Sequence, residues 1–182
     1  MSFLNRLLAA VDTLSLRSGQ AVAFLLLPIC GAMVFEVIAR YMFNAPTIWS
    51  TEMVVMLAGA LYIVGGAYTQ YLRGHISVDT LYDYLSPRWQ TVTRVFVHAP
   101  LFFLYVGILL WEGSGFAWES MIENEHSGSL WNPVIWPYKF VVPLGALLIF
   151  LQGLAQLIRD VRALVTGEDL SVGPSEEVEP EL

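Results

Sequence analysis

The chain has 182 residues, of which 56% are hydrophobic and only 14% are charged, and its mean hydropathy is +0.60. Soluble domains are usually about one-quarter charged, so this composition excludes an ordinary soluble domain and indicates an integral membrane protein. The net charge of −7 arises at the C-terminal end, because six of the sixteen acidic residues lie in the last fifteen positions.

Four apolar segments have the length that a bilayer requires of a helix, about 20 residues each. We predict transmembrane helices over about 19–43, 49–72, 93–116 and 135–158. None of these segments alternates polar and apolar residues as a barrel strand would. The predicted fold class is therefore an all-α integral membrane protein with four transmembrane helices in one domain, 1–165.

Two shorter segments, 1–17 and 76–86, carry apolar residues at helical spacing on one face and polar residues opposite. We expect each to form an amphipathic interfacial helix, and the alternative is that each extends its neighbouring span. Residues 166–182 are acidic, contain proline and lack aromatic residues. That composition predicts a disordered tail.

The distribution of arginine predicts the orientation in the membrane. Four spans place both termini on one side, and the opposite side has only Arg40 and Lys139 as basic residues. By the positive-inside rule, both termini are predicted to be cytoplasmic. The basic residues on the terminal side are Arg6, Arg17, Arg73, Arg88, Arg94, Arg159 and Arg162.

Glu36 and Arg40 are the most costly residues to place in the first predicted span. They are four residues apart with the acid first, which is the favourable order for an ion pair on one helix face. Three interpretations stay open: a local ion pair, a contact with another subunit, or a carboxylate that couples proton or ion movement.

The second predicted span opens with residues that suit a helix start near the membrane surface. Pro46 favours helix initiation, Trp49 favours the interface, and Glu52 lies at the positive end of the helix dipole. Gly59 and Gly66 are seven residues apart on one face and would allow close helix packing. We expect structural or subunit-interface roles for all five.

A second group of polar residues follows this span and consists of Arg73, His75 and Asp79. It offers too few ligands for a metal, so we expect a hydrogen-bonded structural cluster.

The fourth span carries two amide side chains one turn apart, Gln152 and Gln156, which we expect to bond across helices. The chain has no phosphate loop, nucleophile elbow or dinucleotide motif, so we predict no enzyme, no cofactor and no nucleic-acid partner.

The order of these motifs resembles the small membrane subunit (Q subunit, DctQ-like) of tripartite ATP-independent periplasmic (TRAP) transporters. The sequence W-x-x-E opens the second span, R-G-H-I-S-V-D follows it, and F-E-V-I-A-R-Y-M-F-N-A-P closes the first. The likeness covers about 19–158 and leaves out the acidic tail. The family often has paired acids where Thr51 and Glu52 stand, so a role that needs both carboxylates is not expected here.

The resemblance implies a multi-pass protein of the bacterial inner membrane that acts as a scaffold for the large permease subunit. That subunit would take up an organic acid or similar small solute by symport, after delivery by a periplasmic binding protein. The coupling ion, expected to be sodium, would bind the large subunit.

Two alternatives remain at this stage. One is a self-sufficient small four-helix exporter that uses Glu36, and the other is a cytochrome b-like redox subunit. Haem ligation of that kind needs paired histidines, and only His98 lies clearly inside a predicted span.

Overall fold

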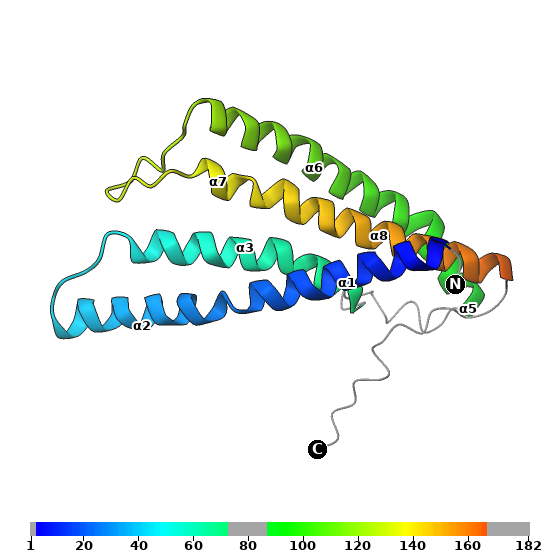
Figure 1. Ribbon diagram of the computed structural model, residues 1–182, viewed down its shortest axis with the longest axis horizontal. Helices are drawn as coiled ribbons and strands as arrows, with labels where there is room; N and C mark the ends of the chain where they lie inside the picture. Colours follow the sequence, from blue (N-terminus) through cyan, green and yellow to red (C-terminus); the bar gives the residue numbers. More distant parts are fainter. Residues whose placement is uncertain (1–2, 73–86, 167–182) are drawn as a thin grey trace, which may run out of the picture.

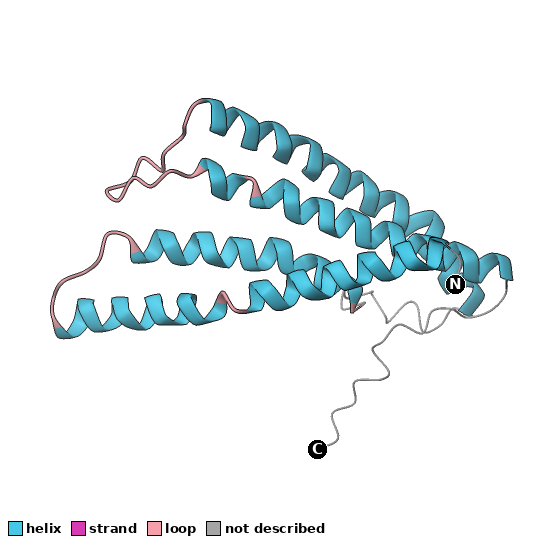
Figure 2. Ribbon diagram, in the orientation of Figure 1, coloured by secondary structure: helices cyan, strands magenta, loops and turns pink. Residues whose placement is uncertain are grey.

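The computed structural model describes residues 3–72 and 87–166, which are almost entirely helical (Figures 1 and 2). The interfacial helix predicted over 76–86 and the tail after 166 lie outside the described residues. The helices are α1 (Phe3–Ala23), α2 (Leu26–Met42), α3 (Ser50–Tyr71), α5 (Pro87–Thr93), the π-helical turn η1 (Arg94–His98), α6 (Ala99–Ile122), α7 (Trp136–Lys139) and α8 (Val141–Thr166).

The prediction of four membrane-spanning helices is confirmed. Four helical stretches in the described ranges are long and apolar enough to cross a bilayer: Leu4–Met42, Ser50–Tyr71, Arg94–Ile122 and Trp136–Val165. α3 has 22 residues and is about 33 Å long, which matches the hydrocarbon core of a bilayer. The cytoplasmic location of the termini stays a prediction.

Prolines account for the irregular points in three of these stretches. Proline has no N–H to donate to the carbonyl four residues earlier, and its ring clashes with that carbonyl. The turn between α1 and α2 lies four residues before Pro28, η1 precedes Pro100, and the break between α7 and α8 precedes Pro143. In η1 the Ala99 N–H reaches back five residues to Arg94 O, as a π-helix requires.

The first helix differs from its predicted boundaries. We expected an interfacial helix to end at 17 and a span to begin at 19, but α1 runs through this point to Ala23. Nothing in residues 17–19 interrupts helical hydrogen bonding, and the interruption comes only ahead of Pro28. α1 packs against α3 and α8, so it is part of the helix assembly.

The third predicted transmembrane helix, which contains α6, extends past its predicted end at 116, as far as Ile122. Ala117 and Ser120 are buried, and this last part of α6 packs against α7. The helix ends at Ile122, and Asn124, two residues later, has a left-handed φ of +48°. Backbone N–H groups of Asn124 and Glu125 bond to Met121 O and Ser120 O, which is a Schellman cap.

The helices lie side by side in the order α2, α3, α8, α6 (Figure 1). α3 packs between α2 and α8, while α6 packs on α8, and α1 lies across α3 and α8. We call the end that holds Phe3 and Thr166 the terminal end, and the end with loops 43–49 and 123–135 the loop end. This layered order leaves α2 and α6 with wide outer surfaces.

Small and polar side chains fill the helix contacts. Ala67, Ala117 and Ala146 are completely buried, whereas large apolar side chains such as Leu27 and Tyr62 are more than 70% exposed. A soluble protein of this size buries its large apolar side chains. The inversion fits helices that pack closely through small residues and turn their large apolar side chains toward lipid or a partner.

Candidate functional site

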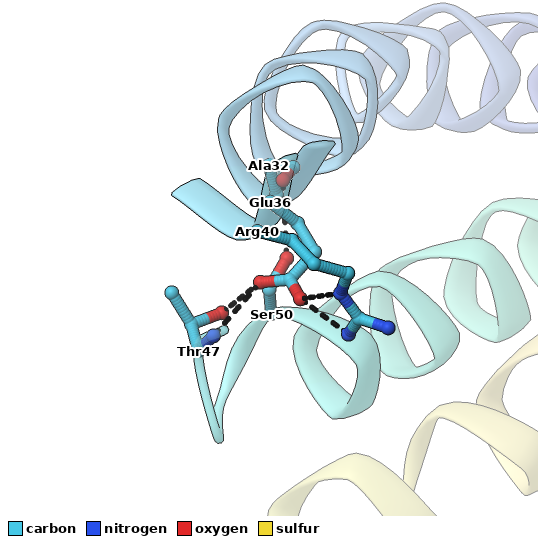
Figure 3. A network of polar contacts seen from close by, with 5 residues as sticks. All are labelled: Ala32, Glu36, Arg40, Thr47 and Ser50. Carbon is cyan, nitrogen blue, oxygen red and sulfur yellow. Dashed lines mark hydrogen bonds and ion pairs between the residues drawn. The ribbon is translucent and has the colours of Figure 1, made fainter. Parts of the chain in front are cut away.

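The Glu36 carboxylate ties the end of α2 to the start of α3 (Figure 3). Arg40, one turn later, donates from Nε at 2.9 Å and from Nη2 at 2.5 Å to Glu36 Oε1. Thr47, in the following loop, donates its backbone N–H at 3.1 Å, and also its hydroxyl, to Glu36 Oε2. Both carboxylate oxygens are therefore bonded within the chain.

Contacts at the first turn of α3 strengthen this connection. Ser50 is only 1% exposed, and its hydroxyl donates a hydrogen bond to the Ala32 carbonyl at 3.0 Å. The Trp49 ring stacks on Phe35 with centroids 5.9 Å apart. Pro46 is exposed in the loop between α2 and α3. Pro46 and Trp49 thus belong to the same helical hairpin, formed by α2, this loop and α3.

The geometry of Glu36 and Arg40 is that of a local ion pair. The Glu36 side chain is only 13% exposed, whereas the Arg40 side chain is 50% exposed. A carboxylate that is sheltered and fully bonded has little freedom to exchange partners. Arg40 can still present the outward side of its guanidinium to another subunit while it holds Glu36.

Glu52 is placed differently, in the first turn of α3. Its Oε2 is buried, and its side chain makes no hydrogen bond with any residue of 3–72 or 87–166. The helix dipole favours a negative charge at this position. A contact between Glu52 and another subunit stays a prediction.

Two of the three glycines of α3, Gly59 and Gly66, provide close packing inside the chain. A Cβ at Gly59 would lie 3.2 Å from Tyr138 Cζ and closer still to its hydroxyl, and one at Gly66 would lie 2.9 Å from Ile149 Cδ1. α7 and α8 therefore approach α3 along the face that these glycines leave free. Their neighbour Gly65 is open, with nothing within 4 Å of its Cβ position.

Arg73, His75 and Asp79 lie outside the described residues. The structure therefore does not test the cluster expected there. Of the ten candidate positions from the sequence, it brings Glu36 and Arg40 into direct contact. Gly59 and Gly66 share one helix face toward α7 and α8.

A second group, which we call the inner cluster, consists of Asp12, Ser15, Gln152 and Arg159. Gln152 Nε2 donates to Asp12 Oδ1 at 3.0 Å and accepts at Oε1 from the Ser15 hydroxyl at 2.8 Å. Arg159 Nη2 donates to Asp12 Oδ2 at 2.5 Å. Ser15 and Gln152 are each 1% exposed. The inner cluster bonds α1 to α8.

The sequence indicated only part of this cluster. The expectation that Gln152 and Gln156 bond across helices is confirmed, since Gln156 Oε1 also accepts from Gln70 Nε2 at 3.1 Å. The helical pattern of 1–17 places its polar residues, Asp12 among them, on the face opposite the apolar residues. A helical pattern shows which residues share a face, but it cannot show whether that face meets water or a polar partner.

At the loop end, Lys139 holds the loop 123–135 against α6 and α7. Its ammonium pairs with the Glu125 carboxylate and lies 3.8 Å from the centre of the Phe116 ring. The hydrogen bond from Lys139 holds the pKa of Glu125 below its usual range, although partial burial opposes this shift. Gly128 and Asn132 have positive φ values and make the turn of the loop.

The polar groups of the contacts described above bond to one another and do not gather as metal ligands. Within the described ranges, no three His, Cys, Asp or Glu side chains lie together as a metal site would need. His98 and His126 lie at opposite ends of α6, so they do not face each other as a haem-binding pair would. What these groups do chemically is fix helices and loops to their neighbours.

Comparison with known proteins supplies the family. No curated protein matches the chain. A family model, tripartite ATP-independent periplasmic transporters, DctQ component, matches residues 29–163. The match covers α3, α5, α6 and α7 completely, with most of α2 and α8. The chain therefore belongs to the DctQ family of TRAP transporter components.

Proposed function

We propose that this protein is a scaffold that holds the large permease subunit of a TRAP transporter in the bacterial inner membrane. The family implies a tripartite system with a large permease and a binding protein. In this proposal the binding protein delivers an organic acid or similar small solute from the periplasm. The large subunit then moves it inward with an ion gradient, with sodium as the expected ion.

The observation that carries the proposal is the contrast between the inside and the outside of the helix layer. Polar groups of α1, α2, α3 and α8 bond to one another within the chain. The outer surfaces of α2 and α6 instead carry large exposed apolar side chains, such as Leu27, Phe35, Leu104 and Ile108. A rigid frame with broad apolar sides suits contact with lipid and with a larger membrane protein.

The state of Glu36 argues against a self-sufficient exporter. A carboxylate that carries protons or substrate must exchange its partners during each cycle. Glu36 accepts bonds from Arg40 and Thr47 on both oxygens, and its side chain is largely sheltered. These contacts suit a fixed structural joint.

Reconstitution into liposomes tests the proposal. The protein is inserted alone, and in parallel with a large permease subunit and its binding protein, and uptake of the binding protein's solute is measured under an inward sodium gradient. We expect uptake only when all three are present and a loss of uptake when this chain is omitted. Transport by this chain alone, or full uptake without it, would overturn the scaffold function.

A variant of Glu52 tests the expected subunit contact. Glu52→Gln keeps the size of the side chain and removes its charge, and Glu119→Gln is the matched control on the exposed side of α6. We expect only Glu52→Gln to weaken co-purification with the large subunit. Equal recovery of both complexes would remove Glu52 from the interface and leave the scaffold function to the reconstitution experiment.

A further inference from the structure

α1 presents two arginines on the face that points away from the other helices. Arg6 and Arg17 are both exposed, and they are eleven residues apart. Eleven residues make three turns of an α-helix, so both arginines project from one side, about 16 Å apart along the axis. Exposed Leu7 and Leu14 lie beside them.

Neither arginine has a partner in the described part of the chain. No ion pair or side-chain hydrogen bond joins Arg6 or Arg17 to residues 3–72 or 87–166. Other arginines at the terminal end are engaged: Arg159 with Asp12, Arg162 with Asn5 and Arg94 with Asp160. Within residues 3–72 and 87–166, the two cations on α1 are therefore available to a further ligand.

The inner cluster fixes the rotation of α1 that creates this surface. Asp12 is the only acidic residue of α1, and Arg159 and Gln152 hold it toward α8. Ser15 is buried by the same contact. Because the acid is turned inward and neutralised, the outward face carries positive charge alone.

The depth of Arg17 matches a membrane surface. Arg17 and Arg40 are separated by 23 residues along α1 and α2, which corresponds to about 35 Å of helix. The hydrocarbon core is about 30 Å thick, with headgroup layers beyond it. If Arg40 marks one surface, Arg17 lies at the phosphate level of the other, and Arg6 lies farther out along the same face.

We propose that this face of α1 is a binding surface for anionic phospholipid headgroups. The guanidinium group of Arg17 would bind a lipid phosphate through paired N–H donors, and Arg6, farther out, would attract the anionic headgroup layer through its charge. The proposal concerns the surface of this chain and does not depend on the transport partner.

The test compares an anionic with a zwitterionic lipid on the full-length protein. Purified protein in a neutral detergent is titrated with fluorescent phosphatidylglycerol or phosphatidylcholine, and the ratio of the two dissociation constants is measured. One basic residue near an anionic surface contributes about fivefold in affinity, so Arg6→Gln with Arg17→Gln should lower the preference for phosphatidylglycerol at least about fivefold, the share of Arg17 alone. High salt should reduce the wild-type preference in the same direction.

The matched control is Arg94→Gln with Arg162→Gln, which removes the same charge from the terminal end but changes arginines that are already engaged. Circular dichroism and thermal melting check that each variant is folded. The proposal is overturned if the wild type shows no preference for phosphatidylglycerol, or if the control variant loses as much preference as the Arg6 and Arg17 variant. A preference that emerges only after residues 167–182 are removed would also overturn it, because the acidic tail would then be the occupant of this face.

Discussion

Gly145 of α8 is the position where a single methyl group should separate two helices. A Cβ there would lie 3.0 Å from both the backbone C and O of Ile63 on α3, and closer still to the Ile63 side chain. Backbone atoms cannot rotate away as a flexible side chain can. Gly145→Ala should therefore push α3 and α8 apart at their contact.

The size of the effect follows from this distance. Ordinary contacts lie at 3.4–4 Å, so the helices must separate by about 0.5–1 Å, a gap that forfeits a quarter to a half of the attraction of each atom pair. Overpacking of this kind usually destabilises by about 1–3 kcal/mol. Alanine is also a better helix former than glycine by about 1 kcal/mol, which partly offsets the loss.

Gly115→Ala is the control that isolates the clash. Gly115 is an exposed glycine inside α6, with nothing within 4 Å of its Cβ position. Both variants gain the same helix propensity, so the difference between them reports the packing term alone. Thermal melting of the two purified variants in one detergent measures it, and 1 kcal/mol corresponds to about 2–4 °C for a chain of this size.

The expected result is a melting temperature for Gly145→Ala below that of Gly115→Ala by a few degrees or more. This difference in melting temperature is expected because α3 and α8 approach each other closely at Gly145. Equal melting temperatures for the two variants would refute it, because they would mean that α3 and α8 can adjust without loss of packing.

Three further predictions concern the polar contacts. Asp12→Asn should lower stability by about 1–3 kcal/mol, because it weakens the charged bond to Arg159, and chemical or thermal unfolding in detergent measures the loss. At pH values above about 4.5, the pKa of Glu125 in the unfolded chain, the Glu125 carboxylate should stabilise the fold. This contribution should disappear as the pH falls through the lower pKa of Glu125 in the folded chain, and thermal melting of wild type and Glu125→Gln across pH 3–8 measures it. Glu36→Gln should lower the melting temperature and leave transport by the assembled complex intact below that temperature, because Glu36 serves a structural joint.

Each of these has a contradicting outcome. Unchanged stability of Asp12→Asn would mean that Arg159 binds α1 equally well without the charge. A constant difference between wild type and Glu125→Gln down to pH 3 would contradict the role of the Lys139 hydrogen bond in lowering the pKa. Loss of transport by Glu36→Gln with normal assembly and melting would make Glu36 a coupling residue.

Local spacing in the sequence predicted several contacts correctly. Glu36 and Arg40 pair as their four-residue separation indicates, because the geometry of one helix fixes that contact. The number of spans followed from length and hydropathy alone. The proline-dependent breaks were also readable in principle, since Pro28 and Pro143 each follow an interruption at the expected distance.

Contacts between distant segments could not be predicted in this way. Thr47 as the second partner of Glu36 depends on how the loop between α2 and α3 folds back. The direction of Asp12 depends on the rotation of α1 about its axis, which Ser15 and Gln152 set from another helix. The same holds for the face of α3 that packs against α8.

Membrane crossing as helices follows from the long apolar segments of the sequence, because the requirement to bury backbone hydrogen bonds in lipid leaves few other solutions for them. Which side of each helix is in contact with another helix depends instead on how the helices pack in the folded chain. In lipid every side of an apolar helix is nearly equivalent in hydrophobic terms. The choice of faces therefore rests on close fits and polar bonds between segments far apart in the chain, such as Gly145 with Ile63 and Asp12 with Arg159.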